Sequence, residues 1–267
     1  MRRFVMCRPT HFDVRYVINP WMNLDTHVDN VEALRQWHGL KARIEALGHH
    51  VDVIDPPEDH PDLVFIANSG VVIGDIALGS RFHHPERRLE AAVYRRELAR
   101  LGIRLEDPTY VNEGQGDFLV RPASTKGAGL VLAGYGPRTE RAAHQELAEL
   151  FGIDVVSLEL VDDRFYHLDT ACSILDERTI LYVPDAFAPA SLRVLCSLFD
   201  RRIALSDDDA AVLGANAISD GSNVIFSDRA RSLGAALRAS DFNPLPVAMG
   251  EFMKSGGGPR CCVLECF

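Results

Sequence analysis

The chain has 267 residues, of which 47% are hydrophobic and 25% charged, a balance typical of a globular protein and not of a disordered or fibrous one. Its 28 basic and 38 acidic residues give a net charge of -10, which argues against nucleic acid as the main partner because an acidic surface repels phosphate. The six cysteines include no Cys-x-x-Cys pair, and the chain shows neither a signal-peptide pattern nor an apolar run long enough to span a membrane. We therefore expect a cytoplasmic protein without a disulfide scaffold.

A helix, a helix stop and a short strand recur along the chain. Five segments with helical periodicity each end at a Gly or Asp, as a left-handed C-terminal cap requires, and each is followed by a short apolar segment. The expected helices are 31–47, 88–101, 139–151, 190–199 and 228–240. The strands expected after them are 50–54, 103–105, 153–156, 203–205 and 246–247.

Further strand-like segments, rich in Val, Ile and Leu, precede these helices. They are 5–7, 71–73, 76–78, 118–120, 129–133, 172–175, 179–182 and 223–226. The unit is therefore β-β-α-β, and five units of about 50 residues account for the chain. A last strand at 261–264 would return to 5–7 and close a ring. The sequence predicts one domain, 1–267, with an α/β fold: a five-bladed α/β propeller of ββαβ repeats with pseudo-five-fold symmetry.

Polar residues open the units at a similar step. They are Asn19, Asn68, Glu113, His167, Asn216 and Cys261, separated by 49, 45, 54, 49 and 45 residues. Closed radial repetition brings equivalent positions to a central channel, so we expect these side chains to converge there.

Cys261 is the candidate nucleophile. It follows Gly-Gly-Gly-Pro-Arg at 256–260, where the glycines let backbone approach a ligand and the arginine favours the thiolate. An inert buried cysteine in a C-terminal strand is an equally good interpretation. On a strand, Cys262 would point to the opposite face, so only one of the pair can enter the site. The same divergence argues against a metal site made by Cys261, Cys262 and Cys266, and we expect no metal.

Two further segments carry candidate acid/base groups. His167 and Asp169 would share one face of a strand, which suits an oriented acid/base, although a locally paired histidine fits as well. Glu113 and Asp117 flank a glycine-rich turn that could bind a cation or a metal, the alternative being a solvated turn. No Walker A or dinucleotide-binding glycine fingerprint is present, so we expect no cofactor.

Taken in order, Glu-Gly-x-Gly-Asp, His-Leu-Asp-Thr and Gly-Gly-Gly-Pro-Arg-Cys resemble the guanidine-modifying superfamily, which includes arginine deiminase, dimethylarginine dimethylaminohydrolase, the amidinotransferases and arginine dihydrolase. The resemblance covers nearly the whole chain and implies the pentein fold, a five-bladed α/β propeller. It implies that Cys261 attacks the guanidinium carbon to give a covalent thiouronium adduct. It also implies that His167 protonates the leaving amine and then activates water. Glu113 and Asp169 would hold the guanidinium nitrogens, as carboxylates do.

Asn68 points to one branch of the superfamily. Arginine deiminase and dimethylarginine hydrolase resemble each other in having an Asp at this position. The arginine dihydrolase branch has Asn there, and segments 7–13 and 17–22 of this chain also resemble that branch. The resemblance implies conversion of arginine to ornithine, two ammonia and one carbon dioxide. A neutral Asn can hold both a guanidinium and the uncharged ureido group of a citrulline-like second substrate, whereas an Asp would favour stopping at citrulline.

The amino-acid end of the substrate needs its own partners. Arg87 and Arg138 resemble the carboxylate-binding arginines of the superfamily, and an arginine fork matches a carboxylate. The alternative for Arg87 is the solvated start of a helix. Asp13 and Asn19 are placed by resemblance near the channel mouth.

The expected partner is therefore a small molecule, arginine or a methylated arginine, with no nucleic acid and no membrane, and a homo-oligomer is possible. Three other functions stay open. They are a dimethylarginine dimethylaminohydrolase giving citrulline and dimethylamine, an amidinotransferase that needs an acceptor amine, and a non-catalytic arginine-binding propeller.

Overall fold

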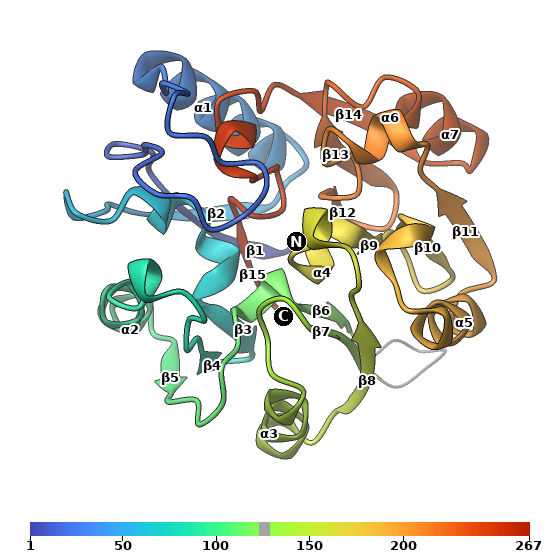
Figure 1. Ribbon diagram of the computed structural model, residues 1–267, viewed down its shortest axis with the longest axis horizontal. Coiled ribbons are helices and arrows are strands. Elements are labelled where there is room, and N and C mark those ends of the chain that lie inside the picture. Colours follow the sequence, from blue (N-terminus) through green and yellow to red (C-terminus); the bar gives the residue numbers. More distant parts are fainter. Residues whose placement is uncertain (123–128) are drawn as a thin grey trace.

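The strands of the protein gather in the middle of the molecule and its longer helices lie around them (Figure 1). The computed structural model describes residues 1–122 and 129–267. The longer helices are α1 (Asn30–Ala46), α2 (Glu90–Arg100), α3 (Ala142–Phe151), α5 (Pro189–Leu198) and α7 (Leu233–Ala239). Each of the five lies inside the helical segment expected from the sequence or extends at most one residue beyond it, and α3 and α7 begin three and five residues later than expected.

The strands form one six-stranded and three three-stranded sheets among the described residues. The largest has the order β2 (His50–Ile54), β1 (Arg3–Cys7), β15 (Leu264–Cys266), β3 (Gly70–Ile73), β4 (Ile76–Gly79), β5 (Arg104–Glu106). The second sheet consists of β6 (Phe118–Arg121), β7 (Leu130–Tyr135) and β8 (Asp154–Glu159). The third consists of β9 (Cys172–Ile174), β10 (Thr179–Tyr182) and β11 (Arg201–Ala204), and the fourth of β12 (Ile218–Ser219), β13 (Asn223–Ser227) and β14 (Asn243–Val247). The protein is therefore an α/β fold with mixed sheets.

Every three-stranded sheet has the same construction. Its first two strands are antiparallel, its second and third are parallel, and one longer helix connects that parallel pair. The six-stranded sheet contains the pattern twice, as β15-β1-β2 and β3-β4-β5, joined by a single parallel bridge between Cys266 and Val72. The C-terminal strand pairs with β1, with Leu264 opposite Val5, so the expected return of the C-terminus to the first unit is confirmed.

Most helix stops behave as the sequence predicts. Gly48, Gly102 and Gly152 have φ of 81°, 79° and 60°, and Asp241 has φ of 66°, so four helices end at a left-handed residue. Asp200 does not have a positive φ, and α5 ends instead on the extended residue Phe199. That expected left-handed cap is wrong.

The expected strand at 261–264 is misplaced. Strand β15 begins at Leu264, and both Cys261 and Cys262 lie in the turn before it. The physical reason is a side chain far away in sequence: Asn216 Oδ1 accepts hydrogen bonds from the backbone N–H groups of Arg260 and Cys261, at 2.9 and 3.2 Å, and so takes them out of any sheet ladder.

His167 and Asp169 do not share the face of a strand. His167 is the N-cap residue of a short helix, α4 (Leu168–Ala171), and Asp169 lies in its first turn. The Asp117 carboxylate accepts a hydrogen bond from the first amide of this helix, Leu168 N, at 3.0 Å, which stabilises the helical turn. Other short elements are α6 (Asp207–Ala210) and the 3₁₀ turns Pro61–Val64, Ile66–Ser69, Pro85–Arg87, Gly114–Gly116, Asp163–Phe165, Pro184–Ala186 and Phe252–Ser255.

The apolar core lies between the sheets and the helices around them. Under α1, for example, the helix places Trp37, Leu40 and Ile44 against Phe4 of β1, and all four are almost fully buried. Burying one such side chain contributes about 1.5 to 3 kcal/mol, so each helix is held to its sheet by packing. Within residues 1–122 and 129–267, no helix has the length and apolar character needed to cross a bilayer.

Candidate active site

The polar residues that open the units are buried, and several of them meet. Asn68 Nδ2 donates to the backbone carbonyl of Glu113 at 3.1 Å, and the Glu113 carboxylate lies 2.6 Å from His167. Asn216 Nδ2 lies 3.1 Å from Cys261 Sγ. The structure therefore brings together residues separated by 45 to 54 positions in the chain.

A small cavity borders two of these groups, Asn68 and Cys261. Its volume is about 10 Å³, room for about one water, and its lining includes Asn19, Asn68, Arg87, Arg138 and Cys261. A much larger cavity, of about 770 Å³, contains Arg260 and Glu265 in its lining but neither Cys261 nor His167. The small one is the candidate active site because Cys261, the candidate nucleophile, lines it together with Asn68 and Arg138. His167 and Glu113 lie outside its lining, but Glu113 binds Arg138, which belongs to it.

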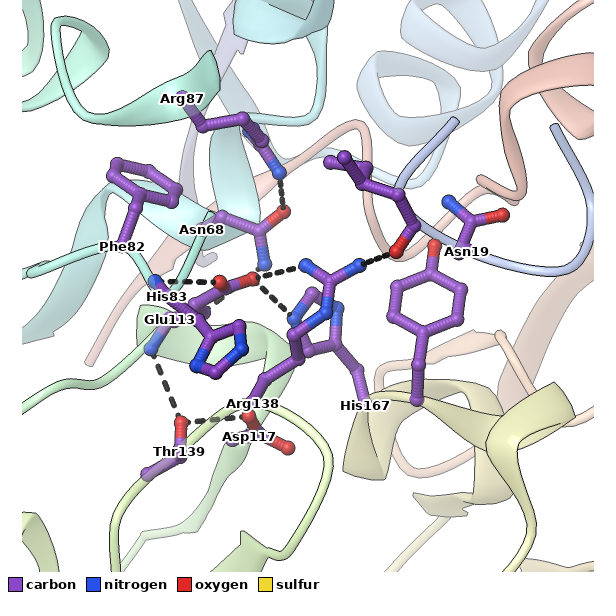
Figure 2. Close-up of polar contacts among 12 residues, drawn as sticks. Asn19, Asn68, Phe82, His83, Arg87, Glu113, Asp117, Arg138, Thr139 and His167 are labelled. Atoms are coloured by element: carbon purple, nitrogen blue, oxygen red, sulfur yellow. Dashed lines mark hydrogen bonds and ion pairs between the residues drawn. The ribbon is translucent and has the colours of Figure 1, made fainter. Parts of the chain in front are cut away.

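Glu113 is the centre of the polar contacts (Figure 2). Its Oε2 lies 2.6 Å from His167 Nε2 and 2.9 Å from Arg138 Nη1, and its Oε1 accepts from His83 N at 3.1 Å. Burial alone would raise its pKa, but the neighbouring Arg138 and His167 outweigh burial and hold the pKa of Glu113 well below its usual range. Glu113 is therefore a buried carboxylate that is ionised at neutral pH.

The contact with Glu113 orients the His167 ring. A carboxylate at Nε2 favours the proton on that nitrogen, which leaves Nδ1 of the neutral ring as an acceptor. Nδ1 makes no hydrogen bond to the described residues. The arrangement is that of a general acid/base held by a carboxylate.

The glycine-rich turn after Glu113 makes this contact possible. Gly114 has φ of 54°, and a Cβ there would lie 2.5 Å from the backbone nitrogen of Gly70. A Cβ on Gly116 would overlap the Asn68 amide and lie 3.0 Å from His167 Nδ1. The Glu-Gly-x-Gly motif therefore serves close packing of the chain's own residues around Glu113.

Asp117, which also belongs to that motif, does not join Glu113 in a cation site. Its two oxygens are used within the protein, Oδ2 by the Thr139 hydroxyl at 2.7 Å and Oδ1 by Leu168 N at 3.0 Å. The Thr139 hydroxyl in turn accepts from Glu113 N at 3.2 Å. Burial raises the pKa of Asp117 to about 6. Asp117 thus fixes the backbone around Glu113 and His167, and the solvated-turn alternative is wrong.

Cys261 lies beside a second buried carboxyl group. Its Sγ is 3.4 Å from Asp169 Oδ2, and burial together with the Asp169 charge raises the pKa of the Cys261 thiol well above its usual value. Burial also raises the pKa of Asp169 to about 7. Asp169 Oδ1 is buried and has no hydrogen-bond partner among the described residues. A cation placed here would favour the ionised form of both groups.

The three glycines before Cys261 leave room for three side chains. A Cβ on Gly256 would lie 2.8 Å from Asn19 Oδ1, one on Gly257 would overlap the Phe65 ring, and one on Gly258 would lie 2.6 Å from Asn216 Oδ1. The glycines were expected to let backbone approach a ligand. In the structure the space that they leave is occupied by the protein itself.

Arg87 is not a solvated residue at a helix start. It is 4% exposed, and its Nε and Nη2 bind the two oxygens of Glu90 at 2.9 and 2.7 Å. Its Nη1 donates to Asn68 Oδ1 at 2.8 Å. Since Asn68 Nδ2 donates to Glu113 O, the Asn68 amide is held in one orientation, with its oxygen toward Arg87.

Arg138 connects the site to the segment between β1 and α1. Its Nη1 binds Glu113, and its Nη2 donates to the Ile18 carbonyl at 2.6 Å. Asn19, next to Ile18, donates to Ser255 O at 3.1 Å and accepts from Trp21 N at 2.9 Å. Asp13 of the same segment pairs with Arg15 at 3.5 Å and is absent from the cavity lining. Its place near the channel mouth stays a prediction.

The repeat step places Asn216 at the channel but assigns it no role in the site. Asp62 and Tyr166, which line the cavity, have no such signal in the sequence. Asp62 carries no motif: it accepts from Tyr16 at 2.8 Å and from Ser255 at 3.1 Å, both distant in sequence. The 45-residue step was the one sequence signal available, and it pointed to Asn216.

Comparison with known proteins gives this geometry a family. The family model for eukaryotic N,N-dimethylarginine dimethylhydrolase matches residues 9–267. The chain belongs to this family. A relative from Mycobacterium tuberculosis, named N(G),N(G)-dimethylarginine dimethylaminohydrolase, is 46% identical over 99% of this chain and 85% of its own length.

Cyanobacterial proteins are also similar. The bifunctional arginine dihydrolase/ornithine cyclodeaminase AgrE from Nostoc sp. is 39% identical over 98% of this chain, which spans 37% of the length of AgrE. The solved N-terminal domain of ArgZ, an arginine dihydrolase, bound to its substrate, superposes with a TM-score of 0.92 at 34% identity, covering 99% of this chain and 98% of that one. The dimethylarginine hydrolase structure from Pseudomonas aeruginosa, with a TM-score of 0.78 at 17% identity over 99% of this chain and 98% of that one, shares the fold.

Proposed function

We propose that this protein is an arginine dihydrolase, which converts free arginine to ornithine, two ammonia and carbon dioxide through a covalent adduct on Cys261. The observation that carries the proposal is the neutral amide of Asn68 in a cavity that also contains Cys261. The amide has one N–H and one lone pair left after its bonds to Glu113 O and Arg87. It can therefore accept from a guanidinium and can both donate to and accept from a ureido group.

The first half of the reaction uses the cation of the substrate. Asp169 Oδ1 has no hydrogen-bond partner in residues 1–122 and 129–267, and arginine bound beside it favours the thiolate of Cys261. The Cys261 thiol gives its proton to His167, and the thiolate attacks the guanidinium carbon. His167 returns that proton to the leaving ammonia as the C–N bond breaks, which leaves a thiouronium adduct. His167 then takes a proton from water, which attacks the adduct and releases the ureido product and the thiol.

The second half repeats the cycle on the ureido carbon. Attack by Cys261 expels the second ammonia and leaves a thiocarbamate, whose hydrolysis gives an unstable carbamic acid that breaks down to ornithine and carbon dioxide. Arginine and two waters thus balance ornithine, two ammonia and carbon dioxide. Glu113, which was expected to grip the guanidinium, is better placed to orient His167, since its Oε2 contacts Nε2 of that ring.

The carboxylate of the substrate is bound in this proposal by Arg138 and Arg87. Both line the cavity, and Arg138 has to exchange part of its bonding to Glu113 and Ile18 O for the ligand. Asn19, in the segment between β1 and α1, contributes a further polar group to the binding of the substrate. Neither a metal nor a cofactor takes part.

Dimethylarginine hydrolysis is the second candidate, because the relative from Mycobacterium tuberculosis bears that name. Side-by-side assays of arginine, dimethylarginine, citrulline and agmatine separate the two. The dihydrolase consumes arginine and citrulline and yields ornithine. Preferential release of dimethylamine, with citrulline as end product, would replace the dihydrolase by the hydrolase of methylated arginine.

Asn68→Asp tests the role of the amide. The carboxylate attracts the guanidinium in the first half but offers no N–H to the ureido oxygen in the second. Leaving that buried acceptor unpaired costs about 1 to 3 kcal/mol, so the second half should slow by about five- to hundredfold and citrulline should accumulate. Unchanged ornithine yield without citrulline would remove Asn68 from this role.

The arrangement in space is part of the same proposal. We infer that the five repeated units form a five-bladed propeller and that 1–267 acts as one catalytic domain, supported by the repeated strand pairing and by the contact of β15 with β1. A cytoplasmic location and a homo-oligomer are also proposed. Cell fractionation and light scattering of the purified protein test these two points.

A further inference from the structure

Asn216 contacts Cys261 more closely than any acid or base of the site does. It lies in the segment between α6 and β12 and is fully buried. Its Nδ2 is 3.1 Å from Cys261 Sγ, whereas the nearest carboxylate oxygen, Asp169 Oδ2, is 3.4 Å away. The repeat step in the sequence placed Asn216 at the channel, but it gave Asn216 no chemical role.

The orientation of the Asn216 amide is fixed by four hydrogen bonds. Oδ1 accepts from the backbone N–H groups of Arg260 and Cys261 at 2.9 and 3.2 Å, so the oxygen has to face them. Nδ2 then faces the Asp169 carbonyl at 3.0 Å and Cys261 Sγ. Every donor and acceptor of the amide is used, and a flipped amide would place NH₂ against two N–H donors. One N–H of Asn216 is therefore aimed at the sulfur.

The sulfur needs such donors. Cys261 is buried and faces the Asp169 carboxyl group, and both conditions disfavour a thiolate. The backbone of Gly258 acts in the other direction and lowers the pKa of the thiol. Gly258 has to be a glycine because a Cβ there would meet Asn216 Oδ1 at 2.6 Å. The glycine-rich segment and Asn216 thus fit together around one sulfur atom.

We propose that Asn216 is a catalytic residue: its Nδ2–H stabilises the thiolate of Cys261, and its Oδ1 holds the backbone of Arg260 and Cys261 so that the sulfur faces the cavity. A hydrogen bond to a charged acceptor is about twice as strong as one between neutral groups, so the Nδ2 contact strengthens when the thiol ionises. The inference rests on the proposed function, in which Cys261 is the nucleophile.

The test measures the thiol without any substrate. Wild type, Asn216→Asp and Asn216→Ser are inactivated by iodoacetamide, a neutral reagent, across a range of pH, and the midpoint of the rate profile reports the thiol pKa. Asn216→Asp removes the donor and adds a negative charge, so the midpoint should rise by about one unit or more, a tenfold loss of thiolate at a given pH below it. The serine side chain of Asn216→Ser is too short to reach the sulfur, so this variant should also raise the midpoint, but by less than Asn216→Asp.

Steady-state kinetics with arginine give the second readout. The kcat of Asn216→Asp should fall at least as much as its thiolate fraction, with KM changed less than threefold. Asn243→Asp is the matched control: it makes the same change at an exposed position of β14 and should leave both the alkylation profile and kcat as in wild type.

An unchanged alkylation midpoint in either folded Asn216 variant would overturn the inference. So would the failure of both variants to give a folded protein by circular dichroism, because Asn216 would then be needed for the fold itself. The outcome is separable from the proposed function. If the midpoint shifts while wild type yields no ornithine, the role of Asn216 stands and the dihydrolase proposal fails.

Discussion

The buried pair of Glu113 and Arg138 allows a stability prediction with a definite size. Three donors converge on the Glu113 carboxylate: His167 and Arg138 on Oε2, and the backbone N–H of His83 on Oε1. In Glu113→Gln only one oxygen remains, so the new NH₂ group has to face at least one of these donors. Arg138, 4% exposed, also keeps its charge without a counter-charge at Glu113.

Breaking a buried ion pair by removing one partner costs about 3 to 5 kcal/mol, whereas removing both charges is often close to neutral. We therefore expect Glu113→Gln to lose about 3 to 5 kcal/mol of unfolding free energy. The double variant Glu113→Gln/Arg138→Met should regain at least half of that loss. The kcat of Glu113→Gln should fall by about 10²- to 10⁴-fold, because the His167 ring loses the group that orients it.

Urea unfolding followed by circular dichroism measures these free energies. Glu86→Gln is the control, because it makes the same change on an exposed side chain. A loss below about 1 kcal/mol in Glu113→Gln, the value of a surface pair, would refute the reasoning. So would a double variant that is less stable than the single one.

Three other changes are predicted. Because the folded pKa of Asp169 is raised to about 7, the native state holds a proton that the unfolded state has lost, and this contribution to stability falls as pH rises from about 4 to 7. The unfolding free energy of wild type should therefore fall by about 1.4 kcal/mol per pH unit between pH 5 and 7, and Asp169→Asn should remove that fall. Urea titrations measure it, and equal slopes of unfolding free energy against pH in the two proteins would contradict the prediction. Gly257→Ala, whose Cβ would overlap Phe65, should lower the unfolding free energy by about 1 to 3 kcal/mol. The control Gly39→Ala, in the open middle of α1, should stabilise the protein, and equal melting temperatures of the two variants would contradict the packing around Gly257. Arg87→Ala should raise KM for arginine more than for agmatine, which lacks the carboxylate, and equal effects would remove Arg87 from that role.

The five longer helices and most strands could be predicted because their signals are local. Helix α3, for example, has apolar residues at helical spacing and ends at Gly152, whose φ of 60° suits glycine. The left-handed cap expected at Asp200 was wrong because the helix before it, α5, ends in extended backbone. Local patterns report the conformation of a segment as long as distant residues do not interfere.

The turn at Cys261 and the helix after His167 could not be predicted, since distant side chains hold them. Asn216 takes the backbone N–H of Cys261 from 45 positions away, and Asp117 binds Leu168 N from 51 positions away. The site residues Cys261, His167 and Glu113 were found through their motifs. Their contacts, above all the carboxylate of Glu113 against His167, depend on the fold and have no trace in local sequence.

The central claim is that one site carries arginine through two hydrolyses. The most direct measurement is the number of ammonia molecules released for each arginine consumed, with guanidino-labelled arginine and with Cys261→Ser as the blank. The account predicts two ammonia and one labelled carbon dioxide per arginine, with ornithine as the product and no turnover in the Cys261→Ser variant. One ammonia per arginine, with the label retained in citrulline, would contradict it.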